Sequence, residues 1–178
     1  MRIAAVLLAA LLLPVPPSAG AAAGASDAAI KAAFLFNFVK FTEWPALTAG
    51  TPIVACIAGG DDIAAELSRI VKTETAGEHA IAVREPRDSA YWQECQILFV
   101  GSGEQRAFTA AVASIRTQPV LTVSDQKDFS RGGGIIELYI EQGRLRFAIN
   151  LDAAERAKLR LSARLLGLAK VVRDGQGQ

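Results

Sequence analysis

Short apolar runs rich in β-branched residues alternate along this chain with segments of helical periodicity. The strand-like runs cover residues 51–60, 79–85, 96–100 and 119–124. The helical segments between them cover residues 63–71 and 104–115. Because strands that alternate with helices are typical of βαβ units, the chain is predicted to form an α/β fold with a mostly parallel sheet and flanking helices.

The pattern changes towards the C-terminus. Residues 135–141 and 144–151 alternate apolar and polar side chains, and Gln142-Gly143 separates them. This arrangement predicts a C-terminal antiparallel β-hairpin. The three glycines at 132–134 are interpreted as a sharp turn into the hairpin rather than as a ligand-binding loop.

Two helices are predicted to follow the hairpin. Asp152 and Glu155 have the spacing of a capping box, which would open a short helix. Residues 162–172 are predicted to close the fold as an apolar helix, with basic residues at its negative end.

Residues 27–44 are predicted to form the first helix, with Asp27 as the N-cap and an end before Pro45. One helical face carries Ile30, Ala33, Phe34, Phe38, Phe41 and Trp44, and the opposite face carries Leu35, Phe36 and Val39. A helix that is apolar nearly all round is buried on two sides. Either the domain covers both faces, which is the simpler interpretation, or a partner covers the second face.

Residues 1–25 have the three parts of a secretory signal peptide. A basic start is followed by an apolar run over residues 3–13, and Ala23 and Ala25 each end an A-x-A cleavage pattern. The apolar run is too short to cross a bilayer, which argues against a membrane anchor. We therefore expect cleavage near Ala23 or Ala25 and an exported, single α/β domain over residues 26–178.

Export determines how the two cysteines, Cys56 and Cys95, are interpreted. In an oxidising compartment this pair allows one intrachain disulfide, which we favour. Each cysteine also lies in or beside a strand-like run, so two buried free thiols are the alternative.

The composition argues against several functional classes. Lys and Arg number 19 against 18 Asp and Glu, so no basic excess favours nucleic-acid binding. One His and two Cys are too few for a structural zinc site. The chain contains no GxSxG elbow, Walker loop or dinucleotide loop. We therefore expect no catalytic residues, no metal, no cofactor and no enzyme activity.

Basic residues are concentrated after the hairpin. They are Arg156, Lys158, Arg160, Arg164, Lys170 and Arg173. A solvated helix face is the simplest interpretation, and an acidic partner or anionic ligand is the alternative. Arg160 lies in the connection between two predicted helices, where neighbouring residues would restrict its side chain.

Four blocks of the sequence occur in a recognisable order. They are KAAFLFNFVKFTEWP (31–45), ECQILFVGS (94–102), LTVSDQKDFSRGGGIIEL (121–138) and RLRFAINLDAAERAKLRLSARLLGLAKVV (144–172). The four blocks and their order resemble those of the YfiR/HmsC-like family of periplasmic proteins, and the resemblance extends over essentially the whole exported chain.

The resemblance implies a regulatory protein. The best understood members repress a membrane-bound diguanylate cyclase by contacting its periplasmic sensor domain, and so restrain cyclic-di-GMP and biofilm formation. The resemblance further implies periplasmic localisation, a disulfide at the Cys56 and Cys95 positions, dimer formation, and an outer-membrane lipoprotein as a second partner.

The sequence supplies candidate contact residues for the cyclase. They are Leu35, Phe36 and Val39 on the second face of the first helix, and Arg160 and Arg164 in the basic segment. Two other functions stay open: a periplasmic small-ligand-binding protein that uses its βα crevice, and a hydrolase with an unrecognised site.

Overall fold

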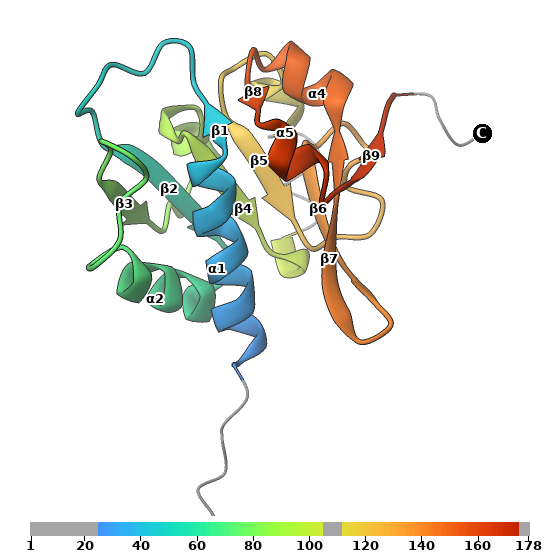
Figure 1. Ribbon diagram of the computed structural model, residues 1–178, viewed down its shortest axis with the longest axis horizontal. Helices are drawn as coiled ribbons and strands as arrows, with labels where there is room; N and C mark the ends of the chain where they lie inside the picture. Colours follow the sequence, from blue (N-terminus) through green and yellow to red (C-terminus); the bar gives the residue numbers. More distant parts are fainter. Residues whose placement is uncertain (1–24, 105–111, 175–178) are drawn as a thin grey trace, which may run out of the picture.

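The computed structural model describes residues 25–104 and 112–174, and its centre is a seven-stranded sheet (Figure 1). In spatial order the strands are β3 (Ile81–Arg84), β2 (Ile53–Ala58), β4 (Ile97–Val100), β5 (Leu121–Ser124), β6 (Ile136–Glu141), β7 (Arg144–Asn150) and β9 (Lys170–Val172). The first five pair in parallel, β7 is antiparallel to β6, and β9 is parallel to β7. The predicted α/β class and mostly parallel sheet are confirmed.

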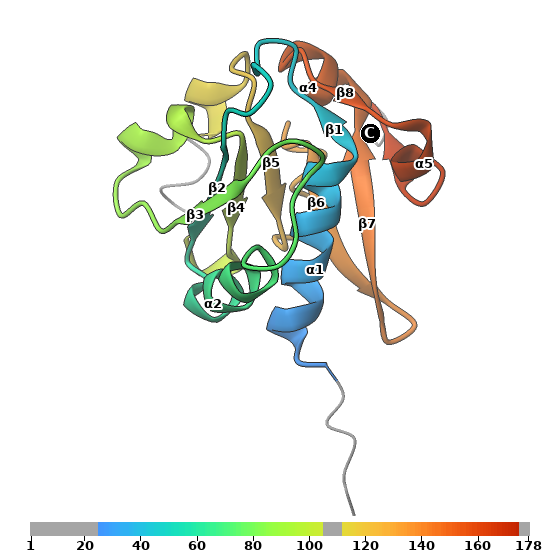
Figure 2. The ribbon, with the colours of Figure 1, turned by 60° about the vertical axis from the view of Figure 1, so that its left-hand side comes forward.

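Both faces of the sheet are covered. Helices α1 (Asp27–Lys40) and α2 (Asp61–Ile70) lie together on one face, as Figures 1 and 2 show. The 3-10 helix η1 (Ser89–Glu94) and the helical residues 112–115 cover the other face. In β2, side chains alternate between two apolar clusters, since Ile53 belongs to one and Cys56 to the other. The remainder of the predicted helix 104–115 lies largely outside the described residues.

Helix α1 is shorter than its apolar pattern predicted. Ser26, rather than Asp27, is the N-cap, because its hydroxyl accepts a hydrogen bond from the Ala29 amide. The helix ends at Lys40 because the next residues form β1 (Thr42–Glu43), which pairs antiparallel with β8 (Arg160–Leu161). This two-stranded sheet joins the N-terminal helix to the C-terminal segment.

A partly buried ion pair fixes α1 to the sheet. Lys31 Nζ lies 2.8 Å from Asp125 Oδ2, at the end of β5, and also contacts Asp27. Burial alone would lower the pKa of Lys31, but the hydrogen bonds to Asp125 and Asp27 outweigh it and raise the pKa. Asp125 also accepts the Ser102 amide, so one carboxylate links α1 to the loops after β4 and β5.

The C-terminal hairpin forms as predicted, in a register that places Leu138 opposite Phe147. The helices after it differ from the prediction. Asn150, rather than Asp152, caps α4 (Leu151–Arg156), because its side chain accepts the Ala153 amide. The predicted helix 162–172 is instead the single turn α5 (Ala163–Leu166) followed by strand β9, because β7 offers residues 170–172 a hydrogen-bonding edge.

Candidate functional site

The predicted helix face is buried rather than available to a partner. Leu35, Phe36 and Val39 are 0%, 7% and 3% exposed and belong to the main apolar core. They face the sheet and α2 because the small residues Ala28 and Ala32 continue the same stripe and allow close packing. In this structure the three side chains therefore offer little surface to a partner, and the exposed surface of α1 lies on its opposite stripe.

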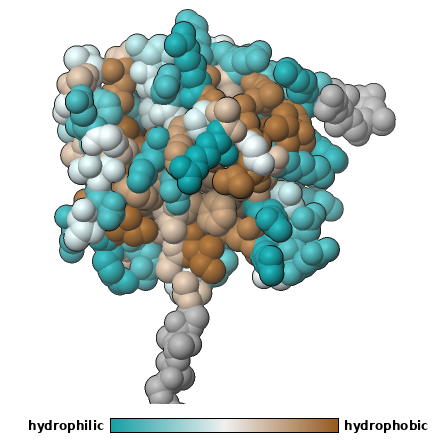
Figure 3. Space-filling view, in the orientation of Figure 1, coloured by the Kyte–Doolittle hydropathy of each residue, from teal (hydrophilic) through white to brown (hydrophobic). Residues whose placement is uncertain are grey.

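The opposite stripe of α1 lines an open groove of about 470 Å³. Its second wall comes from α5 and from Leu168, two residues beyond it, and its floor comes from α1 and β7. The lining residues are Ala25, Ala29, Ile30, Ala33, Phe34, Asn37, Phe38, Phe41, Phe147, Arg164, Leu165 and Leu168. We call this feature the α1–α5 groove. Figure 3 shows apolar side chains gathered over α1 and towards α5 on this face.

Three aromatic rings form the floor of the α1–α5 groove. The ring of Phe38 lies 5.9 Å from that of Phe34 and 5.1 Å from that of Phe147, and Phe34 lies 5.8 Å from Phe147. The tilted and edge-on geometries are those that aromatic pairs prefer. Phe38 is buried while Phe34 is half-buried, so the floor is rigid but presents apolar surface to solvent.

The rim of the groove combines exposed apolar side chains with one cation. Leu168 is 70% exposed and Ile30 is 37% exposed, and together with the half-buried Phe34 they form a contiguous apolar surface along the groove. The Arg164 guanidinium lies 5.4 Å from the centre of the Phe41 ring in a cation–π contact. Arg160 is also exposed, opposite Glu43 in the β1–β8 pair, but it does not line the groove.

Of the residues predicted to contact a partner, the structure places only Arg164 at the groove. Arg164 lies at the groove, while the residues that sequence reasoning missed, Phe147 and Leu168, come from β7 and from the turn after α5. One signal was present in the sequence. Ile30, Ala33, Phe34, Asn37 and Phe41 share a helical stripe whose centre is polar, because Asn37 occupies it, and a polar centre indicates the exposed side of a helix.

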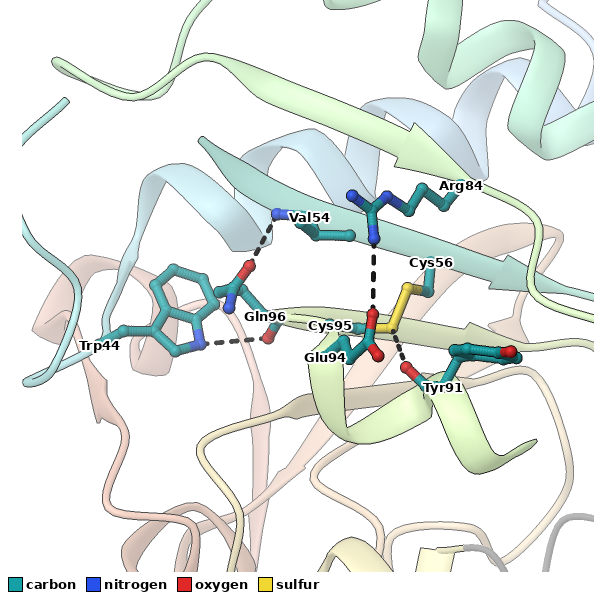
Figure 4. Close-up of a disulfide and its surroundings, with 8 residues drawn as sticks. All are labelled: Trp44, Val54, Cys56, Arg84, Tyr91, Glu94, Cys95 and Gln96. Carbon is teal, nitrogen blue, oxygen red and sulfur yellow. Dashed lines mark hydrogen bonds and ion pairs between the residues drawn. A yellow bond between two sulfur atoms is a disulfide. The ribbon is translucent and has the colours of Figure 1, made fainter. Parts of the chain in front are cut away.

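The two cysteines form a disulfide on the face of the sheet opposite α1 (Figure 4). Cys56 lies in β2 and Cys95 lies between η1 and β4, with their Cα atoms 5.9 Å apart. Next to it, Gln96 accepts the Val54 amide with its side chain and the Trp44 indole N–H with its backbone carbonyl. The disulfide and Gln96 together attach η1 and the start of β4 to β2.

The acidic residues at the carboxyl end of the sheet have structural roles. A cavity of about 760 Å³ lies at the carboxyl ends of β2 and β3, lined by Asp61, Asp88, Trp92 and their neighbours. Asp61 begins α2, and Asp88 caps η1 by accepting the Ala90 amide. Between β2 and β4 the crevice is closed, because a Cβ on Gly101 would lie 2.1 Å from the Gly59 carbonyl oxygen.

The described residues contain no recognisable metal site. Within ranges 25–104 and 112–174, no group of three or more His, Cys, Asp or Glu side chains is placed to bind an ion. His79 has a structural contact, since its Nδ1 lies 2.8 Å from the Thr51 carbonyl oxygen. In the same ranges no helix has the length and apolar character needed to cross a membrane.

The fold and the groove define this protein as a disulfide-bonded α/β domain with an open apolar groove on its surface. The model of the YfiR/HmsC-like family matches residues 28–170, and the chain belongs to this family. Membership supports a periplasmic, regulatory role in diguanylate cyclase signalling. A search of curated protein sequences found no match.

One of two similar solved structures shares the fold at low sequence identity. The ABC domain from Streptococcus pneumonia, solved in complex with L-Trp, superposes with a TM-score of 0.52 at 13% identity, over 79% of this chain and 60% of that one. A conserved domain protein from Vibrio cholerae O1 biovar eltor gives a TM-score of 0.47 at 13% identity, over 82% of this chain and 60% of that one. The chain thus spans about 60% of the length of both proteins.

Proposed function

We propose that this protein is exported to the periplasm and represses a membrane-bound diguanylate cyclase by binding its periplasmic domain through the α1–α5 groove. The observation that carries this proposal is an open apolar groove with a cationic rim on a member of the YfiR/HmsC-like family. The buried stripe of Leu35, Phe36 and Val39 packs the helix in the core, and the exposed stripe of the same helix meets the partner.

The groove has the composition of a protein-binding surface. Burying a large apolar side chain contributes about 1.5–3 kcal/mol, so the exposed atoms of Leu168 and Ile30 supply affinity when a partner covers them. Arg164, stacked on Phe41, is held in place and can pair with a carboxylate of the partner. Aromatic residues and Arg are enriched in the residues that dominate binding energy.

Repression needs only a difference in affinity. The protein lowers cyclase activity if it binds the inactive arrangement of the periplasmic domain more tightly than the active one. A tenfold preference corresponds to about 1.4 kcal/mol, which one good apolar contact supplies. A second partner, such as an outer-membrane lipoprotein or a second copy of this chain, would relieve repression by occupying the same groove.

Replacement of Leu168 by Asp is expected to mimic loss of the gene. The charge would be buried against the partner without compensation, so affinity should fall at least tenfold, while the exposed position leaves the fold intact. The measurement is cellular cyclic-di-GMP, which should rise in the variant and in the deletion strain only when the cognate cyclase is present. Ile30→Asp should behave in the same way.

Tyr91→Asp is the matched control, because Tyr91 is also exposed but lies in η1 on the opposite face of the sheet. It should leave cyclic-di-GMP unchanged. Arg164→Glu should have a larger effect than Arg160→Glu, since only Arg164 lines the groove. If Leu168→Asp represses as well as the wild type, the groove is not the binding surface. If deletion leaves cyclic-di-GMP unchanged, the regulatory function itself is wrong.

Export makes a separate prediction. Protein purified from the periplasm should begin near Gly24 or Ser26, because cleavage after Ala23 or Ala25 removes the signal peptide. Intact-mass measurement decides this directly. A protein that retains Met1 in the soluble periplasmic fraction would contradict it.

A small-ligand-binding function is the second candidate. It is favoured by the cavity at the carboxyl ends of β2 and β3, whose volume of about 760 Å³ lies in the range of ligand pockets. Thermal stabilisation by a metabolite, without any effect of groove variants on cyclic-di-GMP, would favour this function over repression.

A further inference from the structure

Three arginines from separate parts of the chain meet around a cavity of about 310 Å³. Arg116 follows the helical residues 112–115, Arg131 lies in the loop between β5 and β6, and Arg156 ends α4. Gly132, Gly133 and Asp174 complete the lining. We call this feature the arginine pocket. It is separate from the α1–α5 groove, with which it shares no lining residue.

The glycine run makes space for Arg116. Gly133 has a φ of +96°, and a Cβ there would lie 2.7 Å from the nearest Arg116 guanidinium nitrogen. The same guanidinium donates a 2.8 Å hydrogen bond to the Gly132 carbonyl oxygen. The sequence predicted this loop as a simple turn, but the loop also positions the Arg116 guanidinium. Only glycine lets the backbone approach the guanidinium so closely, because any other side chain at position 133 would clash with it.

The loop that carries Arg131 is itself held in place. Glu137, in β6, accepts the amides of Asp128 and Ser130 at 3.1 Å each, and the Ser130 hydroxyl at 2.6 Å. The Ser130 carbonyl oxygen in turn accepts a hydrogen bond from the buried side chain of Asn150 at 2.7 Å. The backbone of the pocket is therefore formed before any ligand binds, which lowers the entropic cost of binding.

The arginine pocket already binds one carboxylate, that of Asp174. Asn150 Nδ2 donates to Asp174 Oδ1 at 2.8 Å, and Arg156 forms an ion pair with the other oxygen. The hydrogen bond from Asn150, with Arg156 and Arg116, holds the pKa of Asp174 below its usual value although partial burial opposes this. The surroundings thus favour an anion.

Two carboxylates, those of Asp174 and Asp128, do not balance three guanidinium groups. Arg131 pairs with Asp128 at 3.6 Å on the exposed side of the loop. Within the described part of the chain, Arg116 has no carboxylate at ion-pair distance, and its hydrogen bond to the Gly132 carbonyl oxygen leaves most of its five N–H donors for another acceptor. The cavity between them has room for several non-hydrogen atoms.

We propose that the arginine pocket binds a small oxyanion with at least two negative charges, such as inorganic phosphate, in competition with the Asp174 carboxylate. Arg116 and Arg131 supply the charge-assisted hydrogen bonds, and Arg156 exchanges Asp174 for the ligand. This exchange leaves β9 in place, because the Asp174 amide and the Arg173 side chain remain bound to Asp152 at 2.8 and 2.7 Å. The inference does not depend on the proposed function.

Titration of the exported chain with inorganic phosphate, at constant ionic strength and with acetate as the monovalent comparison, tests this proposal by calorimetry. Phosphate should bind saturably and more tightly than acetate. Arg116→Gln should weaken phosphate binding at least tenfold, whereas Asp174→Asn should tighten it several-fold by removing the competitor. Citrate, tested in the same way, distinguishes a phosphate from a carboxylate ligand.

Arg69→Gln is the matched control, because Arg69 is an exposed arginine of α2 paired with Glu66 and lies outside the arginine pocket. It should leave phosphate affinity unchanged, and thermal unfolding should verify that every variant is folded. Absence of saturable phosphate binding overturns the proposal, as does an equal loss in Arg116→Gln and Arg69→Gln. Unchanged or weaker binding in Asp174→Asn overturns the competition with Asp174.

Discussion

Replacement of both Cys56 and Cys95 by Ala is expected to lower the free energy of unfolding by about 4 kcal/mol in the chain-entropy account of disulfides. The bridge closes 39 residues, so its removal gives the unfolded chain many more conformations. Both side chains are almost fully buried, so alanine leaves no polar group without a partner. The melting temperature should fall by roughly 10 °C for a chain of this length.

Thermal unfolding with and without a reductant measures this effect. The reductant should destabilise the wild type and leave the double variant unchanged, because the variant has no disulfide to reduce. Equal melting temperatures for the oxidised wild type and the double variant would contradict the prediction.

Phe38→Ala is expected to cost about 3–5 kcal/mol of stability, because it leaves a cavity under the groove. Phe38 is 1% exposed and its ring packs against Phe34 and Phe147, which lie on α1 and β7. Few neighbours can move into the space, since both partner rings are fixed to secondary structure.

Chemical denaturation gives the free energy directly, with the midpoint as the more robust measure. Leu168→Ala is the control, since this exposed residue lines the same groove and should change stability by no more than about 0.5 kcal/mol. A loss below about 1 kcal/mol in Phe38→Ala would show that the aromatic floor is not part of the cooperative core.

The sheet could be predicted from the sequence because its strands are short apolar runs between clear turns. Residues 97–100 and 121–124 are buried on both faces of the sheet. Strands of this kind appear in a sequence as nearly continuous apolar runs. The hairpin was predictable for a related reason, since its period of two is distinct from that of a helix.

The groove could not be predicted because it is made by residues distant in the sequence. The apolar character of α1 extends nearly all round, so the sequence does not say which stripe meets the sheet, and the structure buries the stripe that contains Leu35. Residues 170–172 were predicted as helix because the apolar spacing was compatible with one. Their extended conformation depends on pairing with β7, which is a tertiary contact.

The position of α1 has a consequence for how the chain reaches its folded state. A chain that is made and exported from its N-terminus presents α1 first, yet Phe34 and Phe38 are covered by Phe147, on a strand that is made near the end. Until β7 arrives, an aromatic-rich helix has no permanent neighbour on that side and is prone to aggregate. We therefore expect shortened chains that end before β7 to accumulate as insoluble material.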